Sequence, residues 1–569
     1  MANKKFIPLT IGLLLGVAVM VGVLVTMKHV SNSHAEAADN GDKKVLSTSN
    51  KAIKEICQPT TYKETCEKSL ESVAGNTTDT KGLIQAAFKL AKDEISKALS
   101  KSETIKAAAN DPRAKQGLEI CHEVIKNSVE DLESSIESIG NFSYANIDDF
   151  LEDLKIWVGG AATFQDVCFD AFENATSDAG QKMRDLFNTS RELTSNALTM
   201  ISEVKTLVAD LNIQGLLGGR RLLAASHAPQ AGQLPAWIND AKRNLMTVPL
   251  KSIKPDVVVA LDGSGKFKTI SEALALIPKK NTKPFIIYIK AGVYHEHVTI
   301  DKKMTDVIFI GDGPTKTKIT GNKNFKDGIQ TFKTATVAVM SQGFMARDIG
   351  FENSAGPEKH QAVAIRVVGD YSVFYNCRFD GYQDTLYAVR SRQFYRDCTI
   401  SGTIDFIFGD AQVVFQNCKM IIRKPLENQS CMVTAQGRAE PKGPGATILQ
   451  NCTIVSDPAY YPVRNKNKAY LGRPWKQYSR TIVMQSNIDD SIAPEGWTPW
   501  AGTFGLDTLF YAEYDNRGPG AVQTNRVSWA GIKKLTPQQV QQFTPEKFFK
   551  GSQWIKPTGT PYNPGMIQV

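Results

Sequence analysis

A six-residue pattern recurs four times in the second half of the chain and sharply limits its possible folds. Each copy reads apolar-polar-polar-Cys-polar-apolar, and the copies carry Cys377, Cys398, Cys418 and Cys452, at steps of 21, 20 and 34 residues. Repeats near twenty residues, each one short strand and a turn, indicate stacked coils of a parallel β-helix. A leucine-rich repeat has a similar period, but its Leu pattern is absent. On local signals alone a β-sandwich is the main alternative.

The pattern changes between the two halves of the chain. From Pro255 onward, short β-rich runs are bounded by Gly, Asn, Asp and Pro, which is typical of strands. Residues 47–212 instead contain little Pro or Gly, and in Leu118–Ile136 the apolar residues fall on one face of a helix. Several amphipathic helices joined by short loops predict a helical bundle. We therefore expect an all-α domain over 47–212 and a β domain over 251–569.

Residues 213–250 are expected to form a linker, because Gly-rich and then Ala/Pro/Gln-rich sequence replaces the helical pattern. The linker contains Arg220, Arg221, Leu222 and Leu223, and a dibasic pair in an exported linker is a candidate processing site.

The N-terminus predicts export. Lys4 and Lys5 precede an apolar run over 7–27, so residues 1–46 are interpreted as a signal peptide or a signal anchor. Six Asn-X-Ser/Thr sequences agree with export and are candidate glycosylation sites: Asn76, Asn141, Asn174, Asn188, Asn428 and Asn451. No zinc-finger spacing, RNP-like motif or Arg-rich helix indicates a nucleic-acid partner.

Nine cysteines in an exported chain permit disulfides, and the odd number leaves at least one without an internal partner. Cys57 and Cys66 are nine residues apart and could close a short helical hairpin. Cys121 and Cys168 could cross-link two neighbouring helices.

Charge divides the chain in the same way as the helical and strand patterns. Residues 38–219 hold 20 Lys and Arg against 29 Asp and Glu, a net charge of −9. Residues 220–569 hold 44 against 28, a net charge of +16. Opposite signs suggest that the two halves dock on each other, or that the basic half meets a polyanion.

Two aspartates lie in uncharged, partly aromatic runs. Asp384 lies in the segment Asp380–Thr385, and Asp405 lies in Gly402–Gly409. An isolated carboxylate among apolar groups is costly to keep ionised, whereas two such carboxyls can serve as proton donor and nucleophile. Their 21-residue separation equals one repeat, so they should lie side by side on successive coils.

No Gly-X-Ser-X-Gly, His-Glu-X-X-His or paired Cys-X-X-Cys segment suggests a serine esterase or a metal site, and no cofactor is implied.

A longer set of motifs resembles the plant pectin methylesterases, the pectinesterases. The matching segments are Asp262-Gly263-Ser264-Gly265 with Thr269-Ile270, Gly292-Val293-Tyr294-His295-Glu296, Thr331-Phe332 with Ala335-Thr336, His360-Gln361-Ala362-Val363-Ala364, the two Asp segments, Val433-Thr434-Ala435-Gln436-Gly437-Arg438 and Leu471-Gly472-Arg473-Pro474-Trp475. Residues 47–212 resemble the pectinesterase/invertase inhibitor domain, including its four-cysteine arrangement. The resemblance implies a four-helix bundle followed by a right-handed parallel β-helix.

The resemblance also implies roles for individual residues. Asp405 would be the nucleophile on the C6 methyl ester of galacturonate, and Asp384 the proton donor and later the base. Arg473 would keep Asp405 ionised, while Gln361 and Gln383 would stabilise the oxyanion. Thr331, Gln361, Arg473 and Trp475 would contact the substrate.

The same resemblance implies a Cys377–Cys398 disulfide. Cys418 and Cys452 could form another or remain stacked free thiols. We expect Cys431 to be free and buried, since it has no obvious partner.

The function implied is hydrolysis of methyl-esterified homogalacturonan to pectate and methanol in the plant cell wall or apoplast. The expected partners are this polymer, the chain's own inhibitor-like domain or separate inhibitor proteins, and a processing protease; the mature protein would be monomeric. The rival interpretations are a binding or inhibitory module, and a pectate lyase or polygalacturonase on the same β-helix.

Overall fold

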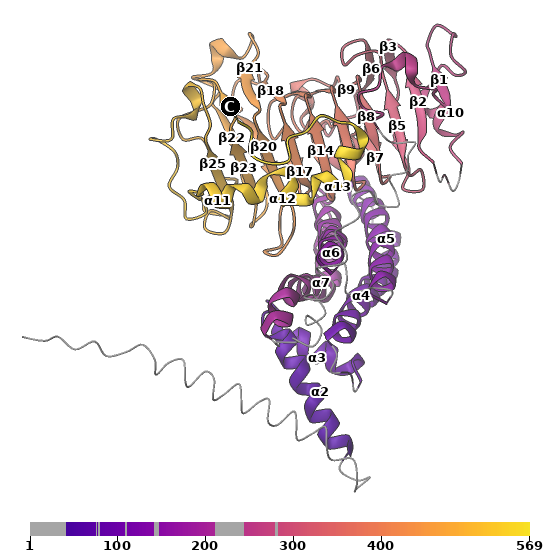
Figure 1. Ribbon diagram of the computed structural model, residues 1–569, viewed down its shortest axis with the longest axis vertical. Coiled ribbons are helices and arrows are strands. Elements are labelled where there is room, and N and C mark those ends of the chain that lie inside the picture. Colours follow the sequence, from indigo (N-terminus) through magenta and orange to yellow (C-terminus); the bar gives the residue numbers. More distant parts are fainter. Residues whose placement is uncertain are drawn as a thin grey trace, which may run out of the picture.

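The computed structural model describes residues 41–75, 77, 80–108, 111–140, 147–210, 244–278, 281 and 283–568. A helical domain precedes a domain of parallel strands, and the bundle projects from one side of the strand domain (Figure 1). The apolar run at 7–27, the Arg220–Leu223 segment, Asn76 and Asn141 lie outside the described residues. Among the helices that the structure describes, none is long and apolar enough to cross a membrane.

The helical domain is a four-helix bundle with a helical hairpin at its far end (Figure 1). In the bundle, α5 packs on α4 and α6, and α7 packs on α4 and α6. The helices of this domain are α2 (Gly41–Cys57), α3 (Lys63–Val73), α4 (Thr80–Ala108), α5 (Pro112–Gly140), α6 (Ile147–Asp170) and α7 (Ala179–Asp210). The buried residues of α4–α7 recur every three or four positions, which is the spacing of one face of an amphipathic helix.

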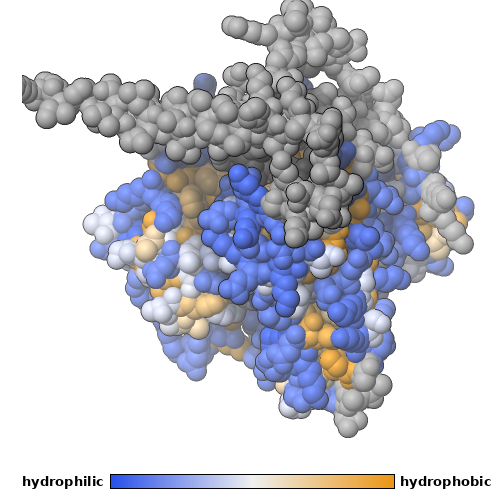
Figure 2. Space-filling model, turned by 90° about the horizontal axis from the view of Figure 1, so that it is seen from below, coloured by the Kyte–Doolittle hydropathy of each residue, from blue (hydrophilic) through white to orange (hydrophobic). Residues whose placement is uncertain are grey.

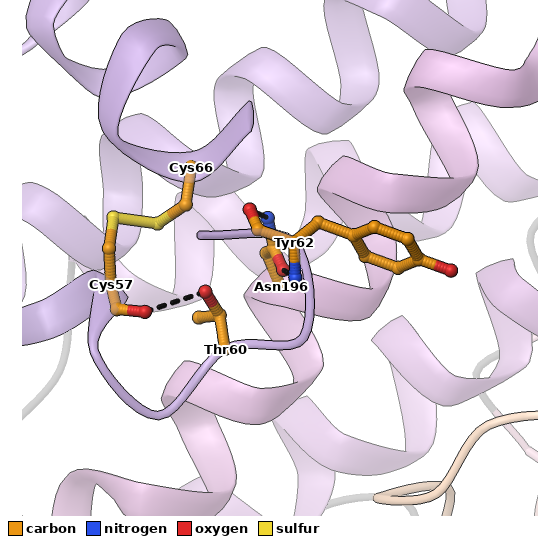
Figure 3. The surroundings of a disulfide bond; sticks show 5 residues. All are labelled: Cys57, Thr60, Tyr62, Cys66 and Asn196. Carbon is orange, nitrogen blue, oxygen red and sulfur yellow. Dashed lines mark hydrogen bonds between the residues drawn. A yellow bond between two sulfur atoms is a disulfide. The ribbon is translucent and has the colours of Figure 1, made fainter. Parts of the chain in front are cut away.

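Two disulfides tie the helical domain together, as the sequence predicts. Cys57–Cys66 joins the end of α2 to α3, and Cys121–Cys168 joins α5 to α6. The loop of the first is held on α7, because Asn196 accepts a hydrogen bond from the Tyr62 N–H (3.1 Å) and donates one to the Tyr62 carbonyl (2.9 Å) (Figure 3). Cross-links of this kind stabilise a small domain by restricting its unfolded chain.

The second domain is a right-handed parallel β-helix, so the β-helix prediction is confirmed and the β-sandwich alternative is wrong. Its strands form three parallel sheets of ten, eight and seven strands, here called sheets A, B and C. Sheet A contains β1 (Val257–Val259), β2 (Phe285–Ile289), β5 (Val307–Ile310), β8 (Met345–Arg347), β11 (Ser372–Tyr375), β14 (Arg392–Arg396), β17 (Gln412–Gln416), β20 (Ala446–Gln450), β23 (Arg480–Met484) and β25 (Phe510–Tyr514). Sheet B contains β3 (Gly292–His295), β6 (Thr317–Gly321), β9 (Gly350–Asn353), β12 (Arg378–Asp380), β15 (Thr399–Gly402), β18 (Lys419–Ile422), β21 (Thr453–Ser456) and β24 (Asn487–Ile488). Sheet C contains β4 (Val298–Ile300), β7 (Val337–Val339), β10 (Ile365–Val367), β13 (Leu386–Ala388), β16 (Ile407–Gly409), β19 (Cys431–Gln436) and β22 (Ala469–Gly472).

Successive coils stack in register, and like residues pile up inside the β-helix. Phe374, Tyr395 and Phe415 are register partners whose rings stack at 4.7 and 4.5 Å. The turn from sheet A to sheet B has a column of left-handed residues with φ between 50° and 56°: Asp348, Asn376, Asp397, Asn417 and Asn451. Asn and Asp tolerate this conformation better than other non-glycine residues, which accounts for the Asn or Asp before each repeated cysteine.

The repeated cysteines form a column of free thiols, and the expected Cys377–Cys398 disulfide is absent. In-register residues of parallel coils point their side chains in the same direction, which does not give the skewed geometry of a disulfide. Each thiol instead lies near a carbonyl of the preceding coil, as Cys398 does with Phe374 O at 3.5 Å and Cys418 with Tyr395 O at 3.4 Å. Cys431 is also free and buried, as the sequence predicts.

The outer faces of two sheets are covered. The C-terminal helices α11 (Pro537–Val540), α12 (Pro545–Phe549) and α13 (Gly551–Trp554) lie on sheet A (Figure 1), where Trp554 and Phe549 join its outer apolar residues in one cluster. Sheet C is covered by the helical domain, with which it shares one apolar core. The surface seen from the side of the bundle is mainly hydrophilic (Figure 2).

Candidate active site

Asp384 and Asp405 lie just before β13 and β16, two adjacent strands of sheet C. Leu386 pairs with Ile407, so the aspartates two positions earlier lie on successive coils in the same register. Both are left-handed, with φ of 64° and 51°, and both are more than nine-tenths buried. The 21-residue separation thus brings the two carboxyls together, as the repeat predicts.

Arg473 follows the end of β22 and reaches Asp405 from two coils away. Its Nε and Nη2 atoms donate hydrogen bonds of 2.9 and 2.6 Å to the two carboxylate oxygens of Asp405. A two-point guanidinium–carboxylate bond fixes the orientation of the carboxylate and favours its charged form. The guanidinium also lies 4.2 Å from the ring centroid of Trp500, which limits its movement.

Burial and charge affect the two carboxyls differently. Burial raises the pKa of Asp384 well above its usual value, and the nearby Asp405 and Glu173 raise that pKa further. Burial also raises the pKa of Asp405, but Arg473 opposes this through its charge and its hydrogen bonds. Asp384 is therefore the group that keeps its proton, and Asp405 is the group held ready to ionise.

The other predicted site residues surround the same pocket, which has a volume of about 280 Å³. Thr331 begins the 3₁₀ turn η4 (Thr331–Lys333), while Gln361 and Gln383 precede β10 and β13. Trp475 follows Arg473 and packs edge-on against Tyr387 and Phe408. All seven predicted catalytic and substrate-binding positions thus line one cavity.

Further aromatic side chains complete the pocket and were missed in the sequence. Tyr387 and Phe408 stack at 4.1 Å on the outer face of sheet C, and Phe332 and Trp500 lie beside them. A signal was present, because Tyr387 and Phe408 each follow an aspartate of the pair by three residues. Aromatic faces beside polar groups suit binding of a sugar ring.

The helical domain supplies one wall of the pocket. Val167, Asp170 and Ala171 near the end of α6, and Glu173 just beyond it, line the cavity with the two aspartates. Lys476, next to Trp475, forms an ion pair with Asp170. The opposite charges in the sequence suggested docking of the two halves as one of two alternatives, and they did not place this helix end at the catalytic carboxyls.

Every ion pair between the two domains places the acid on the helical domain, among the residues that the structure describes. Opposite net charges therefore meet at the interface, in agreement with the docking interpretation of the sequence. The pairs are Glu123–Lys333, Glu130–Lys302, Asp131–Lys302, Asp131–Arg390, Asp149–Lys550, Asp153–Arg392, Asp170–Lys476 and Glu203–Lys442.

The four predicted glycosylation sites that the structure describes differ in how exposed they are. Asn174, Asn188 and Asn428 are exposed, as a glycan requires. Asn451 is half-buried, and its amide nitrogen donates a 2.8 Å hydrogen bond to Asn417 Oδ1. A glycan on this nitrogen would have to displace that bond. Over the described part of the chain, no cluster of three or more His, Cys, Asp or Glu side chains is placed to hold a metal ion.

The β-helix carries a site that combines a protonated carboxyl, an Arg-held carboxylate and aromatic walls. Such a site suits hydrolysis at a carboxylic or glycosidic carbon of a saccharide. Comparison with known proteins narrows this class. Residues 256–552 match the family described as Pectinesterase, and residues 51–200 match the family described as Plant invertase/pectin methylesterase inhibitor.

Individual relatives agree with both family matches. A pectinesterase/pectinesterase inhibitor protein of Arabidopsis thaliana is 46% identical over 99% of this chain and 75% of its own length. A pectinesterase of Petunia integrifolia is 54% identical over 68% of this chain and 99% of its own. The solved pectin methylesterase from carrot shares 50% identity with a TM-score of 0.55, over 55% of this chain and 99% of its own. The chain belongs to the pectinesterase family and carries an inhibitor-family domain ahead of its β-helix.

Proposed function

We propose that this pectinesterase removes the C6 methyl esters of homogalacturonan through a covalent intermediate on Asp405. The observation that carries the proposal is the pair of in-register carboxyls in which only Asp405 is bonded to Arg473. Such a pair separates a nucleophile from a proton donor at one pH. The matching family and relatives support the substrate, and a lyase or a glycosidic hydrolase on the same fold has no comparable support.

The reaction would proceed in two halves. In the first, an Asp405 oxygen attacks the ester carbonyl, the oxyanion is held by the amides of Gln361 and Gln383, and the C6–OCH₃ bond breaks. Asp384 gives its proton to the departing oxygen, which leaves as methanol. In the second, Asp384 takes a proton from water, whose oxygen attacks C6 and breaks the C6–Asp405 bond. Cleavage of that bond restores Asp405 as a carboxylate, while the proton taken from water restores Asp384 as an acid. The product carboxylic acid then ionises by releasing its proton to solvent.

The helical domain would hold the enzyme inactive until the linker is cut. Support comes from α6, whose end lines the catalytic pocket, and from the shared apolar core beneath it. A polymer cannot lie across the outer face of sheet C while the bundle covers it. Processing at Arg220–Leu223 by a protease would release this cover, and separate inhibitor proteins of the same fold could replace it. We further propose that the processed enzyme is a monomer secreted to the plant cell wall.

Replacing Asp405 with Asn tests the proposed nucleophile. The matched control is Asp397→Asn, because Asp397 has the same left-handed backbone (φ 52°) outside the pocket. After linker cleavage, Asp405→Asn should lose methanol release from esterified pectin by about 10³-fold or more, and Asp397→Asn should keep it. Methanol release from Asp405→Asn at the wild-type rate would contradict the assignment.

A further inference from the structure

The turn between β12 and β13 carries Gln383 and Asp384, two side chains that the proposed function uses. Gln383 lines the pocket, and the left-handed backbone of Asp384 (φ 64°) is one that a residue other than glycine adopts only at a cost. The next coil holds part of the turn, because the Thr403 N–H donates a hydrogen bond to Tyr382 O (2.9 Å) and the Asp384 N–H donates one to Ile404 O (3.0 Å). These bonds leave the first carbonyl of the turn and its aromatic side chain to another partner.

Arg423 is that partner, and it reaches the turn from two coils away. It directly follows β18, and β12, β15 and β18 are consecutive strands of sheet B. Its own N–H donates a 2.8 Å hydrogen bond to Gly402 O, which holds its backbone in the ladder. Its Nη1 donates a 2.8 Å hydrogen bond to Gly381 O, and its Nη2 donates one of 2.8 Å to the Tyr382 hydroxyl. The guanidinium carbon also lies 3.8 Å from the centroid of the Tyr382 ring.

These contacts act on the two residues directly before Gln383. A Cβ on Gly381 would lie 2.6 Å from Thr385 Oγ1, so the turn needs glycine there, and glycine has the least restricted backbone. Because a peptide unit is planar, a bond to Gly381 O fixes the plane that joins Gly381 to Tyr382. Both bonds come from a cation, and such bonds are stronger than those between neutral groups. Arg423 therefore helps to set the direction in which Gln383 leaves the turn.

We propose that Arg423 is a positioning residue of the pectinesterase reaction, and that it holds the turn so that the Gln383 amide meets the oxyanion. Arg423 is not among the residues that line the pocket, so it acts through Gln383 and not by contact with the substrate. The proposal rests on the proposed function, in which Gln383 stabilises the oxyanion. A preorganised donor acts on the transition state more than on the bound substrate, so loss of Arg423 should lower kcat and leave KM nearly unchanged.

The first test replaces Arg423 in the linker-cleaved protein after the helical domain has been removed. The carrot structure is matched over 99% of its length by 55% of this chain, so a β-helix domain of this kind exists without a helical one. Arg423→Met keeps a long side chain against the turn but removes the charge and the donors. In methanol release from esterified pectin, it should lower kcat about tenfold or more and change KM less than about twofold.

Arg464 is the matched control, because it makes the same kind of contacts outside the lining of the pocket. It donates a 2.9 Å hydrogen bond to Tyr461 O, and its guanidinium carbon lies 3.7 Å from the centroid of that tyrosine ring. Arg464→Met should therefore leave kcat and KM unchanged. A kcat that Arg423→Met leaves unchanged, or that both variants lower equally, would overturn the proposal.

A second comparison separates positioning from a general loss of folded protein. Gln383→Ala removes the oxyanion donor and should lower kcat by about 10²-fold. In that background Arg423→Met should lower kcat by less than about threefold more, because the amide to be positioned is absent. A general loss of folded protein would lower kcat by the same factor in both backgrounds, and that result would overturn the proposal.

Two conservative variants provide the readout if Arg423→Met does not fold. Arg423→Lys keeps the charge and one donor, so it should lower kcat only about threefold. Tyr382→Phe keeps the ring and loses the hydroxyl acceptor, and it should lower kcat about threefold with KM unchanged. An unchanged kcat in both variants would overturn the positioning role. Methanol release by Gln383→Ala at the wild-type rate would instead contradict the proposed function.

Discussion

Asp384 and Asp405 share residue type, left-handed backbone and register, and they differ in their charged neighbours. Arg473 hydrogen-bonds Asp405, whereas Asp384 has burial and two carboxylates, Asp405 and Glu173, that raise its pKa. The hydrogen bonds of Arg473 at Asp405 and the charge of Glu173 at Asp384 together give two similar carboxyls opposite starting states. At this scale the sequence predicted well, because the 21-residue spacing fixed the register and the resemblance supplied Arg473.

Replacing Arg473 with Gln should move the pH profile toward higher pH. Arg473 lowers the pKa of both aspartates, and its hydrogen bonds add to this effect at Asp405 alone. Without it the pKa of Asp405 rises, so a higher pH is needed to ionise the nucleophile and the acidic limb of kcat/KM shifts upward. At the optimum kcat/KM should also fall by about 10²-fold or more. An acidic limb that stays in place would contradict the assignment of that limb to Asp405.

The cysteine column shows where a residue-scale inference was wrong. The resemblance implied Cys377–Cys398, but the two residues are in-register neighbours on parallel coils and both are free. Only knowledge of the stacking direction, which spacing alone does not give, separates a bonded pair from stacked thiols.

Alkylation of the denatured, unreduced protein therefore should label five cysteines: Cys377, Cys398, Cys418, Cys431 and Cys452. Peptide mass spectrometry distinguishes these from the four cysteines of the two helical-domain disulfides. Labelling of only three residues, with Cys377 linked to Cys398, would contradict the free column.

Helix α6 approaches the β-helix very closely, and a glycine pair makes this possible. A Cβ on Gly159 would lie 2.7 Å from Pro444 Cδ, and one on Gly160 would lie 2.5 Å from Arg390 Nη1. Glycine inside a helix costs about 1 kcal/mol relative to alanine, so the pair is explained by close approach and not by helix formation. Helix and strand patterns predicted the elements, but only the docked structure explains these two residues.

Gly159→Leu should undock α6 without weakening the bundle. The added side chain meets the rigid Pro444 ring, whereas the helix gains about 1 kcal/mol of intrinsic propensity. Uncut Gly159→Leu should therefore release methanol several-fold faster than the uncut wild type. Ser134→Leu, an exposed change on α5, is the control and should leave the rate unchanged. Faster release by both variants would mean that docking is not the cause.

The pocket residues that the sequence did not predict share one physical reason. Val167, Asp170 and Glu173 reach the pocket only because α6 docks there, and no local pattern in 47–212 encodes the position of another domain. Trp500 likewise arrives from a loop beyond the last strand of sheet C. Periodicity predicts the coils and their register, whereas contacts between distant loops depend on the assembled surface.

At the scale of the whole molecule, an acidic domain covers a basic one, and a buried carboxyl lies between them. Asp410 directly follows β16 at this interface, where it accepts hydrogen bonds from Thr163 of α6 (2.8 Å) and from Gln436 (3.0 Å). Burial raises the pKa of Asp410 from 3.8 to about 7, with Asp166 of α6 adding to this and Thr163, Arg438 and Gln436 opposing it. The neutral form of Asp410 therefore favours the docked state.

Docking should weaken as pH rises. A carboxyl whose docked pKa lies above its free value contributes its full stabilisation below the free value, and that contribution disappears as pH rises toward about 7. The dissociation constant of the separated domains, measured at pH 5 and 7.5, should increase with pH in the wild type. In Asp410→Asn the increase should be several-fold smaller. A wild-type affinity that rises with pH would contradict this role of Asp410.

The central claim is that one pectinesterase site, carried by Asp384 and Asp405, lies beneath the chain's own helical domain. Its most direct test is the rate of methanol release from esterified pectin by the same protein, before and after the linker is cut and the helical domain is removed. The rate should rise more than about tenfold, because docking leaves only a small open fraction. An uncut chain that already releases methanol at the rate of the separated β-helix would contradict the account.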